Sequence, residues 1–234
     1  MNYLKEEFNI KTFPSETIVF HNGIFIKNLS DSKQEIIFTD NKTKIIINSF
    51  SSLPIHIIYV GEISGDIDLN FEIKIPNQKV VFTTKIKNKN PAFLNIFIKN
   101  TGKNSNFNGN FLIQNYCSFS LKQIVQHFSK NTGIFLNNKI IGHSGTKTKL
   151  YGISKIEPGC DICSSDINFA VLAALDAEIL FSPNQQISSI PEFAGHSAFL
   201  WQAKQPVIQY LSSTGLSLSE IKKVLEEAFT NDIF

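Results

Sequence analysis

The pattern with the most recognisable chemistry in this sequence is Cys160-Asp161-Ile162-Cys163. Two cysteines at this spacing occur in zinc sites and in redox sites, but a cysteine-type zinc site needs two further ligands. Of the remaining residues, only Cys117 is a cysteine, and no second pair of cysteines or matched pair of histidines accompanies it. We therefore expect Cys160 and Cys163 to be small, buried or half-buried residues in a turn. They remain the thiolates to test if a cluster is bound.

The second candidate is a pair of carboxylates, Asp176 and Glu178, on either side of Ala177. If this segment is a strand, both side chains face the same side, because side chains alternate along a strand. Carboxylates are hard oxygen ligands, so the pair could hold iron. The alternative is an ordinary acidic strand surface that faces solvent.

The third candidate is His196, which lies between Gly195 and Ser197 in a strand-like stretch. A neutral imidazole is a common metal ligand. The spacing alone, however, favours a structural histidine that is held by hydrogen bonds. The other histidines have no partners at a recognisable spacing, and we assign them no role: His21, His56, His127 and His143.

Short strands are the elements that must position these residues. In Asp66–Ile75, five apolar residues occupy every second position, which predicts a strand with one buried face. Similar runs continue to about residue 150, separated by turn signals such as Gly61 and Pro76-Asn77. This spacing suits a β-sandwich or a β-solenoid. Beyond Phe119, the recurring units of a strand and a glycine favour stacked rungs.

The last thirty residues change to a helical pattern. Ser217-Leu218-Ser219-Glu220 is a capping box that predicts the start of a helix. Pro206 suits the first turn of a shorter helix, and Gly215 is placed to end it with a positive φ. The apolar residues of the final helix fall on one stripe: Ile221, Val224, Leu225, Ala228 and Phe229. We expect the chain to close with a helical hairpin.

Composition excludes several functions. Twenty-two basic and twenty acidic residues leave a charge of +2, too small a surplus for a nucleic-acid-binding or anionic-membrane-binding protein. Met1–Glu7 carries acids with no apolar run behind it, unlike a signal peptide, so we expect a cytoplasmic protein. The sequence contains no phosphate loop, dinucleotide-binding motif or nucleophile elbow, so any ATPase activity must come from a partner.

The C-terminal part resembles the SufB/SufD family of iron–sulfur cluster assembly proteins. The resemblance rests on His196, on Tyr210-Leu211-Ser212-Ser213-Thr214-Gly215-Leu216 at the family spacing, and on Ala228-Phe229. Upstream, Leu180–Ser182 and Ile187–Pro191 resemble the apolar strand and the proline that precede the histidine strand. The resemblance covers about residues 120 to 229.

This resemblance implies an all-β protein, a right-handed parallel β-helix (β-solenoid) with a short C-terminal helical hairpin. The implied organisation is an N-terminal segment (1–16), a β-helix core (17–203) and a helical subdomain (204–234). That subdomain would dock a SufC-like ABC ATPase through its exposed residues: Lys204, Gln205, Gln209, Tyr210, Ser212, Ser213 and Gly215. The alternative is a solvated cap on the solenoid. Family members pair through their C-terminal ends, so a homodimer or a heterodimer with a SufB-type paralogue is expected.

The resemblance also implies that His196 is a ligand for iron or a transient iron–sulfur cluster at a subunit junction. Because carboxylates suit incoming iron, Asp176 and Glu178 could form an entry site with it. The sequence departs from the SufB pattern at three positions. Ser197 stands where SufB has Glu, Thr214 where an Arg is usual, and Asp176 near the SufB cysteine. The chain is therefore closer to SufD or to short archaeal-type members.

Two other classes remain open. A carbohydrate-processing β-helix would need a long groove of acids and aromatics, against which the sparse paired acids argue. A structural or adhesive β-solenoid would act by surface contact alone.

Overall fold

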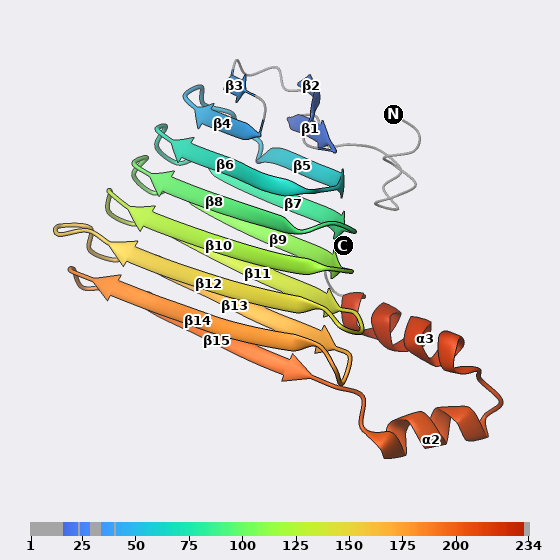
Figure 1. Ribbon diagram of the computed structural model, residues 1–234. Helices are drawn as coiled ribbons and strands as arrows, with labels where there is room; N and C mark the ends of the chain where they lie inside the picture. The colour runs from blue at the N-terminus through green and yellow to red at the C-terminus, as the bar shows by residue number, and fades with distance from the viewer. Residues whose placement is uncertain (1–15, 23, 29–33, 40, 232–234) are drawn as a thin grey trace.

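A computed structural model describes residues 16–22, 24–28, 34–39 and 41–231 (Figure 1). Residues 1–15, most of the expected N-terminal segment, lie outside the described part. The strands are β1 (Thr17–His21), β2 (Ile24–Asn28), β3 (Glu35–Thr39), β4 (Lys42–Ile47), β5 (Ile55–Glu62), β6 (Gly65–Ile73), β7 (Lys79–Asn88), β8 (Ala92–Asn100), β9 (Asn106–Asn115), β10 (Ser118–His127), β11 (Gly133–Gly142), β12 (Lys147–Ile156), β13 (Ser164–Ala173), β14 (Glu178–Ile187) and β15 (Phe193–Trp201). The helices are α2 (Gln205–Ser213) and α3 (Leu218–Thr230).

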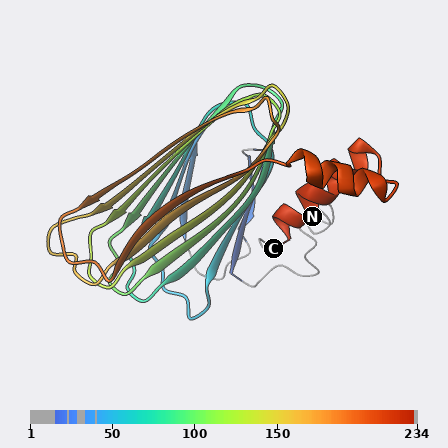
Figure 2. The same ribbon diagram turned by 90° about the horizontal axis from the view of Figure 1, so that it is seen from below.

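From β4 onward, successive strands alternate between two sheets. One sheet has the order β2-β1-β5-β7-β9-β11-β13-β15, and the other β3-β4-β6-β8-β10-β12-β14. Apart from the antiparallel pairs β1–β2 and β3–β4, neighbouring strands are parallel. Figure 2 shows the two sheets as the long walls of a flattened tube, with the helices beside one end of its cross-section. Parallel stacking identifies a β-solenoid and excludes the sandwich, which confirms the expected fold with its two C-terminal helices.

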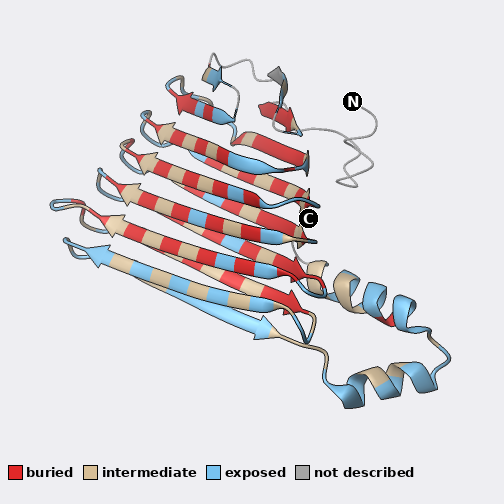
Figure 3. Cartoon of the chain, viewed as in Figure 1, coloured by how far each residue is buried: buried red, intermediate tan, exposed pale blue. Residues whose placement is uncertain are grey.

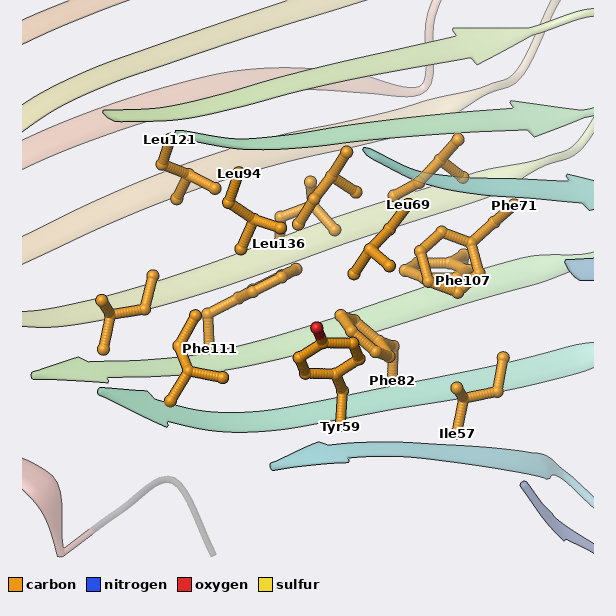
Figure 4. Packing of buried hydrophobic residues seen from close by; sticks show 14 of the residues in the cluster. Ile57, Tyr59, Leu69, Phe71, Phe82, Leu94, Phe107, Phe111, Leu121 and Leu136 are labelled. Carbon is orange, nitrogen blue, oxygen red and sulfur yellow. The ribbon is translucent and has the colours of Figure 1, made fainter. Parts of the chain in front are cut away.

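The interior is filled by side chains that alternate inward along each strand. In β6, the predicted apolar face is buried at Ile67, Leu69, Phe71 and Ile73. Aromatic rings from successive rungs and from both sheets meet inside the tube (Figure 4). The ring of Phe71 lies 5.0 Å from that of Phe82 and 5.2 Å from that of Phe107. The sequence alternation therefore becomes a continuous core only when rungs stack.

Asparagine side chains form a ladder at one set of turns. Asn77, Asn104 and Asn131 all have a positive φ, near 58°, 60° and 55°, which asparagine tolerates better than most residues. The amide of Asn104 donates to Asn77 Oδ1 at 3.1 Å, and that of Asn131 donates to Asn104 Oδ1 at 3.1 Å. In the next rung, Ile162 takes the same backbone conformation, with a φ of 59°.

The helical hairpin follows its predicted local signals. The Ser217 side chain accepts from the backbone of Glu220, and the Glu220 side chain accepts from the backbone of Ser217 at 2.8 Å. Pro206 lies in the first turn of α2, and Gly215 has a φ of 94°. The hairpin is nevertheless only loosely packed: α2 buries no residue and α3 buries only Ile221 within the described part.

Three local predictions were wrong. Gly61 does not break a strand: it lies inside β5, with a φ of 114°, where Asn22 occupies the space that a Cβ would need. Asp176 lies in a turn and not on a strand. The predicted apolar stripe of α3 is interrupted, since Val224 and Ala228 are exposed because the solenoid lies against only one side of the helix. No helix in the described residues is long and apolar enough to span a membrane.

Candidate functional site

The C-terminal end of the solenoid is open. β14 and β15 are the last strands of their sheets, with no further rung beside them in the described part of the chain. Figure 3 shows that burial falls sharply from β13 to these two strands. Ile179 and Phe181 of β14 only partly cover the core, and Leu200 of β15 is exposed. The open end therefore combines unpaired strand edges with apolar side chains.

His196 faces the interior of this open end. Its backbone lies beside Ile167 of β13, which in turn lies beside Leu136 of β11. Both neighbours are buried in the core, and residues in register along a parallel stack face the same side. His196 therefore occupies a core position that is exposed only because the solenoid stops there.

The two carboxylates are not joined on one strand face, contrary to expectation. Asp176 lies in the exposed turn between β13 and β14, where it accepts a hydrogen bond of 2.6 Å from Ser144. This hydrogen bond lowers the pKa of Asp176. Glu178 begins β14, and its carboxylate lies 3.1 Å from the Lys147 ammonium. Both side chains already have partners.

The cysteines lie in the turn between β12 and β13, as expected of small turn residues. Both are free thiols and both are buried, Cys163 completely. Cys163 Sγ lies 3.2 Å from the Thr132 hydroxyl, which lies 2.7 Å from His127 Nδ1. Burial raises the pKa of Cys160. This environment protects thiols and does not favour reactive thiolates.

The predicted ligands therefore occupy separate places. The cysteine turn precedes β13, whereas Asp176 and Glu178 follow the other end of this strand. His196 lies beside Ile167, in the first half of β13. From Ile167 to Ala173 alone the strand spans roughly 20 Å at about 3.3 Å per residue. Within the described residues, no three His, Cys, Asp or Glu side chains are grouped so that they could hold a metal ion.

The predicted partner-binding residues lie on the hairpin. Lys204 precedes α2, and every one of the seven is exposed. Beside them, the end of β15 and the start of α2 border a hollow of about 580 Å³. Its apolar lining includes Leu175, Phe199, Leu200 and Val207, all exposed.

One polar group was missed by sequence reasoning. His143, after β11, is buried and lies against α3 beside Glu226. Nothing in the spacing of His143 shows this, because Glu226 comes from a helix far along the chain. The stacking of Tyr116 on the His143 ring, at 3.9 Å, likewise depends on two rungs lying side by side.

Comparison with models of known protein families gives no match to this sequence, and comparison with curated proteins gives none either. The resemblance to SufB/SufD therefore depends on the residues quoted above.

Proposed function

We propose that the chain is a non-hydrolytic scaffold subunit of an iron–sulfur cluster assembly complex that works with a SufC-like ABC ATPase. The observation that carries this proposal is the position of His196. An imidazole, a side chain of a type that can bind metal, stands at an inward core position in the last turn of the β-solenoid, just before the helical hairpin. Unlike the inward-facing His127, which is buried against Thr132, His196 is exposed at the open end and accessible to a partner.

The open end is proposed as the surface that pairs with a second copy or with a SufB-type paralogue. Unpaired strand edges attract other strands and are normally covered. Pairing would cover Leu200 and the edges of β14 and β15, and would place the partner beside His196. The missing ligands for iron or for a transient cluster would then come from the partner, since this chain does not group three of its own within the described residues.

The ATPase is proposed to dock on the hairpin and the hollow beside it. Tyr210 is 69% exposed on a helix without buried residues. Closure of two ATPase subunits would pull on the hairpins and shift the paired ends, admitting iron and sulfide to His196. The buried free thiols Cys160 and Cys163 suit a reducing, cytoplasmic compartment.

Co-expression with a SufC-type ATPase tests the scaffold role. We expect the two proteins to co-purify. If they form no complex although the hairpin of this chain is intact, the proposal is contradicted. Anaerobic reconstitution with iron and sulfide tests the site: His196→Ala should lose cluster absorbance, whereas His56→Ala, a half-buried histidine in β5, should not. Equal absorbance in both variants would remove His196 from the site.

A structural β-solenoid that acts by surface contact is the second candidate. It is favoured by the separation of the predicted ligands and by the existing partners of Asp176 and Glu178. If the paired chain takes up neither iron nor cluster, and no ATPase binds, this candidate replaces the scaffold.

A further inference from the structure

A cavity of about 270 Å³ lies between the solenoid and the hairpin. The solenoid contributes Ile141 and Leu172, and α3 contributes Ile221 and Leu225. Such mixed walls arise because α3 covers the corner of the tube without filling the space beneath it. The cavity adjoins the hollow beside the open end, since Ala203 lines both, but its other lining residues include His143, Leu172 and Glu226, which the scaffold role does not use.

One end of this cavity is polar. His143 is 7% exposed, and neither of its ring nitrogens has a hydrogen-bond partner. Glu226 Oε1 is also buried without a hydrogen bond and lies 3.7 Å from His143 Nδ1. The Lys222 ammonium lies 3.8 Å from the same oxygen. Buried polar atoms without partners are costly, so a hydrogen-bonding group that enters here gains more than it would in water.

The charges around this end select the kind of group. Burial lowers the pKa of His143 to about 4, so the imidazole is neutral at pH 7. Burial also raises the pKa of Glu226, with Lys222 acting in the opposite direction. The Tyr116 ring stacks on the His143 ring from the preceding rung. A ligand carboxylate would be repelled by the like charge of Glu226, and a ligand ammonium would be repelled by that of Lys222. A hydroxyl avoids both conflicts, because it donates to one oxygen or nitrogen and accepts from another.

We propose that this cavity binds a small uncharged alcohol or phenol, with its hydroxyl between His143 and Glu226 and its apolar body against Leu172, Ile221 and Leu225. The volume is adequate, since dry apolar cavities of about 150 Å³ hold a benzene ring. A ligand there touches the solenoid and α3 together and fastens the hairpin to the tube. The inference goes beyond the scaffold role and does not depend on it.

The test uses the full chain and p-cresol, with toluene as the probe that lacks the hydroxyl. By titration calorimetry or ligand-observed NMR, we expect p-cresol to bind up to about tenfold more tightly than toluene, the value of one good hydrogen bond. Benzoate and benzylamine should bind more weakly than p-cresol. No saturable binding of p-cresol up to its solubility limit would overturn the proposal.

Variants locate the binding. Leu225→Trp fills the cavity and should abolish binding of both probes, while Val224→Trp, on the exposed side of the same helix turn, should not. If Leu225→Trp does not fold, Ala203→Leu, which also adds bulk to the cavity lining, should abolish binding of both probes. His143→Phe keeps the ring on Tyr116 and should remove the preference for p-cresol over toluene. Unchanged binding in the filled variants, or an unchanged preference in His143→Phe, would overturn the assignment.

Discussion

Gln123 and Asn138 face each other across the interior of the solenoid and exchange two hydrogen bonds, of 2.7 and 3.0 Å. Gln123 belongs to β10 in one sheet and Asn138 to β11 in the other. Both side chains are buried, and Asn138 also donates to the carbonyl of Asn168. This amide pair joins the two walls through side chains, as Ser154 and Ser165 do in the next turn of the solenoid.

The first prediction concerns this pair. Gln123→Leu should destabilise the protein by about 1–3 kcal/mol, because it leaves the buried Asn138 amide without one partner. Replacing both residues with leucine should cost less than the sum of the single changes. Urea unfolding of the four proteins in a double-mutant cycle measures the coupling. Strictly additive effects would show that the two amides do not act as a pair.

The second prediction concerns the turn at Ile162. A β-branched residue with a φ of 59° is strained, and the rungs before it use asparagine there. Ile162→Asn should stabilise the protein by about 1 kcal/mol, because it relieves strain and lets the new amide donate to Asn131 Oδ1 and extend the ladder. Thermal unfolding provides the measurement. Ile190→Asn, at a neighbouring exposed isoleucine, is the control and should change the midpoint little.

The third prediction is a pH dependence due to His127. Burial lowers its pKa from 6.5 to about 4, so the unfolded chain binds the proton more readily than the folded one. His127 therefore contributes stability that is complete above pH 6.5 and is lost as the pH falls towards 4, on the order of 3 kcal/mol.

His127→Asn isolates this contribution. Asn100 occupies the equivalent position one rung earlier and accepts a hydrogen bond from Ser105 at 2.6 Å, as His127 meets Thr132. Asparagine should therefore fit at position 127. Above pH 6.5, the unfolding free energies of the wild type and the variant should change with pH in the same way. Below pH 6.5, the wild type should lose more stability than the variant. Parallel curves down to pH 4 would contradict the assignment.

The fourth prediction concerns the proposed pairing at the open end. Leu200 faces inward on β15, in register with the buried Val171, yet it is 45% exposed. Leu200→Lys should prevent pairing and shift the protein to a monomer in light scattering. Ser182→Lys, on the outer face of β14, is the matched control. If the wild type stays monomeric at high concentration and also forms no complex with a SufB-type paralogue, this end is not an interface.

The fifth prediction concerns the hairpin. Tyr210→Asp should prevent co-purification with the ATPase, because it places a charge in the proposed docking surface. Lys223→Ala, on the exposed side of α3, should not. Circular dichroism of both variants should match the wild type, so that a lost complex cannot come from unfolding. Retention of the ATPase by Tyr210→Asp would place the docking surface elsewhere.

Much of the fold was predictable because its signals are local. Alternation in Asp66–Ile75 predicts which side chains of β6 face inward, and the observed burial follows it. The capping box at Ser217 and the positive φ of Gly215 depend on a few adjacent residues, and both appear as predicted.

The site was less predictable because its geometry depends on contacts between distant residues. Parallel register places His196 beside Ile167 and so directs it into the open end. Asp176 lies in a two-residue turn before β14, so it does not share a strand face with Glu178. Docking of α3 buried His143 beside Glu226, although the two are far apart in the chain.

Alternation and capping were thus readable in the residues themselves, since they reflect side-chain direction and backbone hydrogen bonding within one strand or one helical turn. The parallel register of the rungs, the open end and the cavity under α3 were not readable, because each depends on which strand or helix lies beside which. That choice is made by burial of the whole core, and no short stretch of sequence encodes it.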